Sequence, residues 1–111
     1  MKRKKIKKTM NELLVIDESY TIHRKKGNGL LSRQVWKDGA NKVTRYSLAY
    51  INHEIFQGDN GRVLGYDNSH NHHHRHFMGK VESIVFVNFE ELEIQFMKEF
   101  EVLHEQVKKK Q

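Results

Sequence analysis

The C-terminal part of the chain carries a regular apolar pattern, and this pattern limits the choice of fold more than any other feature. An apolar residue recurs at every third or fourth position, at Phe89, Leu92, Phe96, Phe100, Leu103 and Val107. This spacing predicts a long amphipathic helix with one continuous apolar stripe. Asn88 is placed to cap the helix, Glu91 completes a capping box, and the lysines at 108–110 suit its negative end. We expect the stripe to pack on a sheet rather than to bind a partner, because a lone sheet needs a cover.

The preceding residues read as short strands separated by turns. Extended segments are predicted at 13–16, 20–23, 31–36, 43–51, 62–66 and 81–87, with a further short run at 54–57. In the clearest of them, Tyr46, Leu48 and Tyr50 alternate with polar or small residues, which predicts one aromatic face. Glycines at 27 and 29 predict a turn, and Asp38-Gly39 and Asn60-Gly61 predict tight hairpins. The expected fold class is therefore α+β, an antiparallel meander of five to seven strands covered by one long C-terminal helix.

The length of 111 residues allows one domain. We expect residues 1–10 to be a basic disordered arm and residues 11–111 to form a single α+β domain. The first 45 residues carry thirteen Lys and Arg against four acids, whereas the remainder carries seven against ten. This asymmetry indicates an anionic partner such as nucleic acid, with phosphate contacts from the arm, although a lysine-rich tail that only keeps the protein soluble is the alternative. The lysines concerned are Lys4, Lys5, Lys7 and Lys8.

The chain contains no cysteine, which excludes disulfides and thiolate metal sites and suits a reducing compartment. No apolar run approaches the ~20 residues that span a bilayer, and the charged N-terminus lacks the apolar region of a signal peptide. We therefore expect a cytoplasmic protein that does not contact a membrane. The oligomeric state stays open, with a homodimer as one option.

Five of the eight histidines fall between residues 70 and 76, in a segment of little apolar content that is predicted to be a loop. Three interpretations follow. The first is metal binding, because imidazole is a common ligand, but the spacing suits no closed structural site. The sequence thus predicts no cofactor, with adventitious or functional divalent metal at this loop as the alternative.

The second interpretation is acid–base chemistry on RNA. Cleavage without a metal needs a base, an acid and a cation on the phosphate, and His74-Arg75-His76 contains all three groups. In an extended backbone the two imidazoles would point one way and Arg75 the other, so this interpretation requires a bend. His70 or His73 can instead supply the second imidazole. The remaining candidates are Asp67 and Tyr66 for orienting a ring or transferring a proton, and Arg45 and Arg62 for contacting phosphate.

The third interpretation is structural. Asp67-Asn68 is a strong turn former whose side chains can cap backbone amides. Tyr46, Tyr50 and Tyr66 can be ordinary sheet residues with solvated hydroxyls.

The block from residue 59 to residue 76 resembles the signature of the TumE-like family of toxin–antitoxin proteins. The matching residues read DNGRVLGYDN at 59–68, then His70, then HHRH at 73–76. Residues 45–50 (RYSLAY) resemble the central strand of that family, and the Phe-rich helix resembles its C-terminal part, so the resemblance covers about residues 31–105. Asn71, His72 and Ser83 depart from the family pattern. Asn71 keeps a turn that glycine would otherwise make, since Asn tolerates the left-handed conformation.

The resemblance implies a toxin that is encoded beside a helix-turn-helix antitoxin and acts on RNA. The positions that carry over are Tyr66, Asp67, Asn68, His70, His74, Arg75 and His76. The leading hypothesis is therefore a toxin that resembles a metal-independent ribonuclease, with loop histidines as acid and base and with Arg75 and Arg62 on phosphate. The alternative is a non-enzymatic regulatory module that binds nucleic acid or protein through its basic surface, and a metal-dependent hydrolase is a third option.

Overall fold

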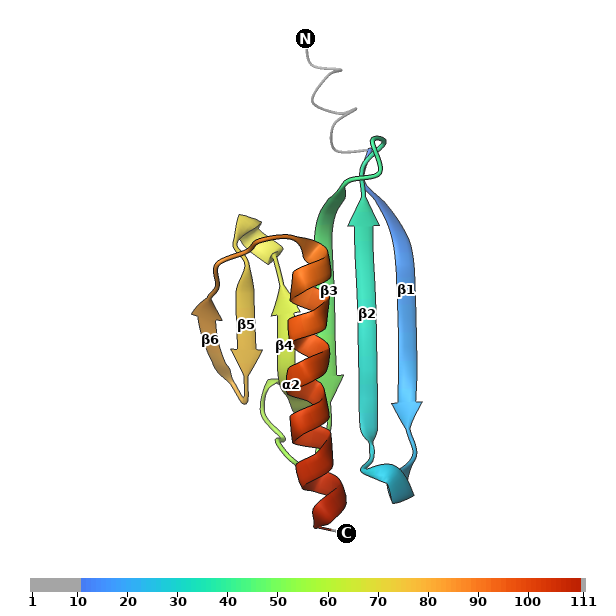
Figure 1. The fold of residues 1–111 in the computed structure, drawn as a ribbon, viewed down its shortest axis with the longest axis vertical. Helices are drawn as coiled ribbons and strands as arrows, with labels where there is room; N and C mark the ends of the chain where they lie inside the picture. The colour runs from blue at the N-terminus through green and yellow to red at the C-terminus, as the bar shows by residue number, and fades with distance from the viewer. Residues whose placement is uncertain (1–10, 111) are drawn as a thin grey trace.

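The computed structural model describes residues 11–110, so the predicted arm at residues 1–10, with its lysines, lies outside the described residues. The described residues form a six-stranded antiparallel sheet in which the strands lie side by side in chain order, followed by one helix (Figure 1). The elements are β1 (Leu13–Ile22), β2 (Gly29–Lys37), β3 (Val43–Ile51), β4 (Arg62–Asp67), β5 (His74–Phe77), β6 (Lys80–Ser83) and α2 (Phe89–Lys109). The predicted α+β meander with a long C-terminal helix is confirmed.

The helix begins as its sequence predicts. Asn88 accepts a hydrogen bond from the backbone N–H of Glu91 through its side-chain oxygen (2.8 Å), which satisfies one of the free amides of the first turn. Glu90 and Glu91 lie in the first turn and Lys108 and Lys109 in the last, and both placements suit the helix dipole.

Several strand boundaries differ from the prediction. The segments expected at 13–16 and 20–23 are one continuous strand, β1, because the polar residues between them lie at the edge of the sheet and stay solvated. The segment at 81–87 is a strand only to Ser83, after which the backbone N–H of Ile84 donates to the carbonyl of His73 (3.1 Å) and the chain turns towards the helix. Within the predicted histidine loop, residues 74–77 form the unexpected strand β5.

The tight hairpin predicted at Asn60-Gly61 is also wrong. Strand β4 pairs with β3, not with residues 54–57, and the connection runs from Asn52 to Gly61. The buried side chain of Asn52 organises this connection by donating to the carbonyls of Gly27 and Asn28 (both 3.1 Å) and accepting from the N–H of Glu54 (3.0 Å). Turn residues alone therefore did not determine which strands pair.

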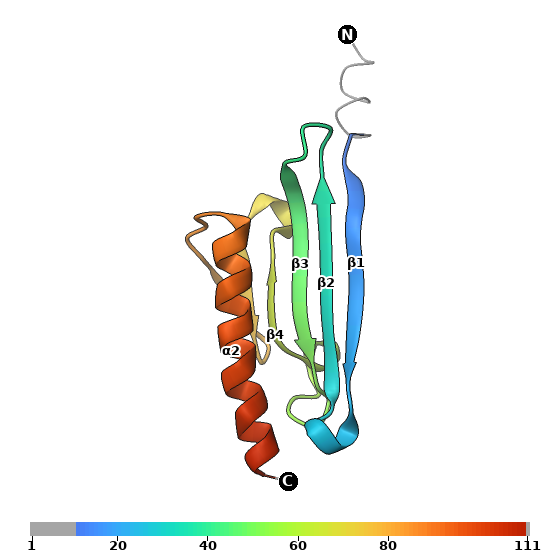
Figure 2. The same ribbon diagram turned by 45° about the vertical axis from the view of Figure 1, so that its right-hand side comes forward.

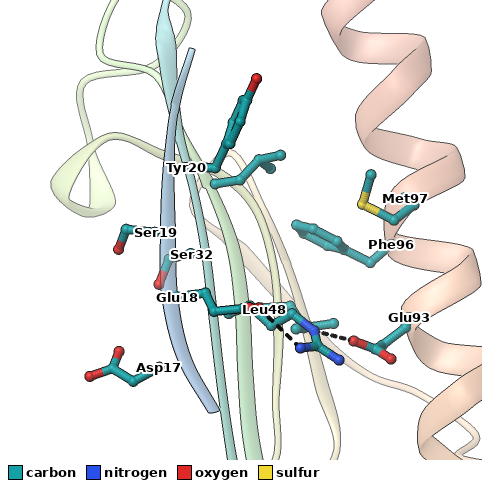
Figure 3. Close-up of a pocket in the computed structure, with 11 residues that line it drawn as sticks. Asp17, Glu18, Ser19, Tyr20, Ser32, Leu48, Glu93, Phe96 and Met97 are labelled. Atoms are coloured by element: carbon teal, nitrogen blue, oxygen red, sulfur yellow. Dashed lines mark hydrogen bonds and ion pairs between the residues drawn. The ribbon is translucent and has the colours of Figure 1, made fainter.

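The single helix lies along β3 and β4 on one face of the sheet, and in the described part of the chain nothing covers the other face (Figure 2). We call this other face the open face. On the face that carries the helix, β1 and β2 lie beside α2 and are not covered by it. This leaves a groove of about 640 Å³ between these strands and α2 (Figure 3).

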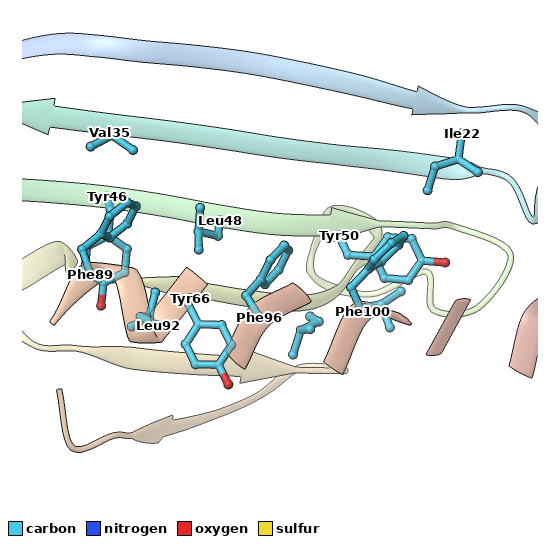
Figure 4. Packing of buried hydrophobic residues seen from close by; sticks show 12 residues of the cluster. Ile22, Val35, Tyr46, Leu48, Tyr50, Tyr66, Phe89, Leu92, Phe96 and Phe100 are labelled. Carbon is cyan, nitrogen blue, oxygen red and sulfur yellow. The ribbon is translucent and has the colours of Figure 1, made fainter. Parts of the chain in front are cut away.

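The core fills the space between α2 and the aromatic face of β3 and β4 (Figure 4). Tyr50 meets Phe100 edge to face (ring centroids 4.9 Å apart, 82°), and Tyr66 meets Phe96 in the same way (6.2 Å, 85°). The predicted aromatic face of β3 is confirmed by burial, and so is the predicted apolar stripe from Phe89 to Phe100, whereas Leu103 and Val107 at its end are only partly buried. The buried residues that they contribute are Tyr46, Leu48, Tyr50, Phe89, Leu92, Phe96 and Phe100.

Candidate functional site

Strands β4 and β5 bring four of the predicted site residues together on the open face. Asp67 pairs with His74 and Gly65 pairs with His76 in the register of these two strands. Because side chains alternate along a strand, His74 and His76 both project away from the helix, on the same side as Asp67. Arg62, at the start of β4, reaches the same place. We call these residues the open-face cluster, defined as Arg62, Asp67, His74 and His76.

The carboxylate of Asp67 is the centre of this cluster. Its Oδ2 lies 2.8 Å from Nε2 of His76, and its Oδ1 lies 3.7 Å from Nδ1 of His74. Oδ1 also accepts hydrogen bonds from the backbone N–H (3.1 Å) and the hydroxyl (2.6 Å) of Ser69. Burial acts to raise the pKa of Asp67, but the hydrogen bonds from Ser69 and the nearby charge of His76 outweigh it and lower the pKa below its usual value. Asp67 is therefore ionised at neutral pH.

Arg62 holds His76 from the other side. Its Nη2 lies 3.0 Å from Nδ1 of His76, its Nη1 lies 3.7 Å from Oδ2 of Asp67, and its Nε donates to Asp59 (2.8 Å). A guanidinium only donates, so Nδ1 of His76 is the acceptor in this contact, and Nε2 is the nitrogen that faces Asp67. This buried Nε2 makes no well-oriented hydrogen bond, although the carboxylate oxygen is 2.8 Å away.

His74 is the more accessible imidazole of the pair. Its ring centroid lies 6.1 Å from that of His76, at an angle of 61°, and 5.8 Å from that of His72. Nδ1 of His74 faces Asp67, and no hydrogen bond within residues 11–110 engages its Nε2. The cluster thus combines an ionised carboxylate, a partly exposed imidazole and a cation, which are groups that can exchange protons with, and bind, a phosphate ester.

Tyr66 and Arg75 lie on the helix side of the sheet instead. The bend that a joint role of His74, Arg75 and His76 requires does not form, since β5 is extended and its alternate side chains project to opposite faces. The guanidinium of Arg75 donates to Glu99 of the helix (Nη2 to Oε2, 2.8 Å) and to Glu82 of β6 (3.3 Å). The hydroxyl of Tyr66 donates to Glu99 as well. Burial is the main reason that the pKa of Tyr66 is raised, and the carboxylate of Glu99 raises it further.

His73 also faces the helix side. Its Nδ1 lies 2.7 Å from the hydroxyl of Tyr46, and its ring stacks on Phe86 (centroids 3.9 Å apart, 8°). Burial, assisted by the charge of His74, lowers the pKa of His73, and burial raises the pKa of Tyr46. Both groups are therefore neutral at physiological pH and form a packed contact beside the core.

Two further predicted residues lie apart from the cluster. His70 is exposed in the 3-10 turn Ser69–Asn71, where its φ is 58°. Arg45 lies on the open face, but its guanidinium sits over the ring of Trp36 (4.1 Å to the centroid) and its Nε is 3.5 Å from Glu12.

The structural interpretation of Asp67-Asn68 holds in part. The side-chain oxygen of Asn68 accepts from the N–H of Tyr46, and its amide donates to the carbonyl of Thr44 (both 3.0 Å). Asn68 thus ties the end of β4 to β3, while Asp67 both caps Ser69 and contacts the two histidines.

Three residues that support the cluster are not among the candidates that the sequence predicts: Asp59, Gly65 and Ser69. Gly65 matters because Arg62 lies across it, and a Cβ at this position would come within 2.7 Å of Cδ of Arg62. A glycine inside a strand is a recognised sign of such a close approach and was the one available signal. Asp59 and Ser69 carried no comparable signal, since both types are common in turns.

Among residues 11–110, no group of three or more His, Asp or Glu side chains is arranged to hold a metal ion. The same residues contain no helix that is both long and apolar enough to cross a membrane.

The sequence matches the model of a family described as "Toxin TumE" over residues 6–105. No curated protein and no solved structure matches the chain. The matched segment includes all four residues of the open-face cluster.

Proposed function

The chain belongs to the TumE toxin family and is a toxin of a toxin–antitoxin system, and we propose that it acts on RNA through the open-face cluster. The observation that carries this proposal is the convergence of two imidazoles, an ionised carboxylate and a guanidinium on a sheet face that no described element covers. The chemistry of these groups fits a phosphodiester, and an uncovered sheet face gives a nucleic acid room to approach.

In the proposed reaction, Nε2 of His74 takes the proton from a ribose 2′-hydroxyl. The freed 2′-oxygen attacks the adjacent phosphorus, the bond from phosphorus to the 5′-oxygen breaks, and a 2′,3′-cyclic phosphate forms. Asp67, through Nδ1, orients His74 and stabilises the imidazolium. General acid–base catalysis of this kind contributes roughly 10²–10⁴ to a rate.

Arg62 and His76 take the other two roles. Arg62 turns from His76 to the non-bridging phosphate oxygens, where a guanidinium binds well because its donors match the phosphate geometry. This movement frees Nδ1 of His76 to carry a proton, while Asp67 faces Nε2 and stabilises the charged ring. His76 then gives a proton to the departing 5′-oxygen, so the two histidines act as base and acid on one phosphate.

The open face supplies further contacts for RNA next to the cluster. Trp36 and Arg45 are cross-strand partners on this face, and a guanidinium stacked on an aromatic ring can in turn stack on a base. The residues between this pair and the cluster are small, namely Ser47, Ala49 and Gly65. We expect Lys4, Lys5, Lys7 and Lys8 to add phosphate contacts. Because the proposed substrate is RNA, we also expect the protein to act in the cytoplasm.

Induced expression in a bacterial host tests the catalytic roles. Wild-type protein should arrest growth and produce cleaved RNA with cyclic phosphate ends, whereas His74→Ala and His76→Ala should each remove both effects. His70→Ala is the matched control, because this exposed histidine lies in the same segment but outside the cluster, and it should remain toxic. Undiminished arrest by both cluster variants, with all proteins folded, contradicts the catalytic roles.

A second candidate function is a non-enzymatic module that binds nucleic acid, and the basic N-terminal sequence is the observation that favours it. In that case removal of residues 2–8 should abolish toxicity while the histidine variants stay toxic. Binding driven by phosphate contacts should also weaken steeply with salt.

The antitoxin is the partner that family membership implies. We expect it to be a helix-turn-helix protein encoded next to the toxin, and sequencing of the neighbouring gene tests this expectation directly. No metal or other cofactor is part of the proposed reaction.

A further inference from the structure

Strand β1 is an edge strand of the sheet, and its outer edge is free to pair with a strand of a partner. It pairs with β2 along one edge, and no strand within residues 11–110 pairs with its other edge. This free edge is ten residues long. It includes exposed apolar side chains, and the exposed fraction of Tyr20 is 68%. Long edges of this kind are normally shortened, charged or covered, because their unpaired amides and carbonyls bind other strands.

The groove on the helix side lies directly beside this edge. Figure 3 shows Tyr20, Phe96 and Met97 projecting into the space between β1 and α2, and Leu31 and Leu48 complete its apolar lining. Met97 is 41% exposed although it is apolar. An additional strand paired with β1 would place every second side chain above this groove.

The charged residues at one end of the groove indicate which type of side chain such a strand would place there. Arg33 lies between Glu18 (3.1 Å) and Glu93 and makes an ion pair with each. Two carboxylates face one guanidinium, so this end of the groove keeps an excess of negative charge. A basic side chain from the partner would complete the set.

We propose that the antitoxin adds a β-strand to the free edge of β1, with alternate apolar side chains in the groove and a basic side chain beside Glu18 and Glu93. Main-chain hydrogen bonds along β1 supply the pairing and the groove supplies the selectivity. This proposal rests on membership of a toxin–antitoxin family, not on the RNA activity proposed above.

The same charges argue against two other occupants. Asp17 and Glu18 lie at the middle of β1, so symmetric antiparallel pairing centred on this strand would place acidic residues of two copies opposite each other. Like charges directly opposite destabilise a strand pair. An RNA phosphate would meet the unbalanced carboxylates of Glu18 and Glu93.

Amide hydrogen exchange on the wild-type chain, alone and bound to its purified antitoxin, tests the proposal without any substitution. Exchange across Leu13–Ile22 should slow at least tenfold in the complex. Unchanged exchange in β1 overturns the proposal, and so does protection of β1 that a second copy or an RNA oligonucleotide produces in the absence of antitoxin.

Substitutions then test the groove. Tyr20→Asp with Met97→Glu should weaken antitoxin binding at least tenfold in calorimetric titration, while toxicity without antitoxin persists. Val102→Glu is the matched control, because Val102 is exposed on the same helix but does not line the groove, and this variant should bind normally. Equal antitoxin affinity in all three chains would exclude the groove. If the double variant melts early, the exchange experiment decides.

Discussion

Nε2 of His76 lies 2.8 Å from Oδ2 of Asp67, while Nδ1 of the same ring accepts from Arg62 at 3.0 Å. The ring is therefore fixed between an acceptor and a donor, which determines both its orientation and the nitrogen that carries the proton. Such positioning by a carboxylate is what proton transfer by histidine requires, and it makes Asp67 the residue on which the whole cluster depends.

Replacement of Asp67 by Asn keeps the shape of the side chain but removes its charge. We expect RNA cleavage to fall by at least tenfold and the free energy of unfolding at pH 7 to drop by about 1–3 kcal/mol, because the two donors of Ser69 lose an ionised acceptor and His76 loses the carboxylate beside it. Cleavage of RNA by the purified protein and urea unfolding measure the two effects.

The pH dependence of stability gives an independent check on Asp67. Its pKa is lowered in the folded state, so its ionised form stabilises the fold above the unfolded value of about 3.9. That contribution is lost as the pH falls from about 3.9 through the lower folded pKa. Asp67→Asn should therefore flatten this part of the stability profile, and an unchanged acid profile would contradict the assignment.

Gly65→Ala tests the placement of Arg62. The new methyl group would lie 2.7 Å from Cδ of Arg62 and 3.2 Å from the carbonyl oxygen of Leu48, so the arginine side chain must leave its place across residue 65. We expect cleavage to fall severalfold and stability to decrease by about 1 kcal/mol. Gly39→Ala is the control, since beyond the two neighbouring residues no heavy atom lies within 4 Å of its added Cβ, and it should behave like wild type.

The sequence predicted the helix and the central strand well because both carry strong periodicity over many residues. Strand β5 has no such pattern, since three of its four residues are polar, and it is extended only because it pairs with β4 and β6. Residues 54–57 are the reverse case, where a short apolar run suggests a strand but no neighbouring strand is available to pair with it.

All four members of the open-face cluster were candidates from the sequence, but their grouping was not predictable. It depends on the register in which Asp67 meets His74 and Gly65 meets His76, and a shift by one residue would exchange the two faces. The same register sends Tyr66 and Arg75 to the helix, where Glu99 binds both. Spacing along the chain predicted which residue types take part, whereas strand pairing decided which of them meet.

His73 should make stability depend on pH near neutrality. Its pKa is lowered in the folded state, so the unfolded chain binds the proton more readily and stability falls as the pH drops below the unfolded value of about 6.5. His73→Phe keeps the stacking on Phe86 and should reduce this dependence between about pH 5 and 7. Urea unfolding at several pH values measures it, and an identical slope in both proteins would be the contrary result.

Chelation tests the chemistry of the cluster. The proposed reaction uses only side chains, so RNA cleavage by purified protein should continue in excess EDTA with less than a twofold change in rate. Loss of cleavage that zinc or manganese restores would favour a metal-dependent hydrolase. His74→Ala provides the background rate for this comparison.

Arg62 and Arg75 lie on opposite faces of the sheet and should therefore respond differently to substitution. Arg75 neutralises Glu99 and Glu82, so Arg75→Leu leaves a half-buried carboxylate without its partner and should cost about 1–3 kcal/mol of folding free energy. Toxicity at a temperature where the variant stays folded should persist. Arg62→Leu should instead abolish toxicity, because the phosphate loses its cation. Thermal unfolding with growth assays separates the two, and toxicity lost in Arg75→Leu at full folding would return Arg75 to the RNA-contacting role that the sequence predicts.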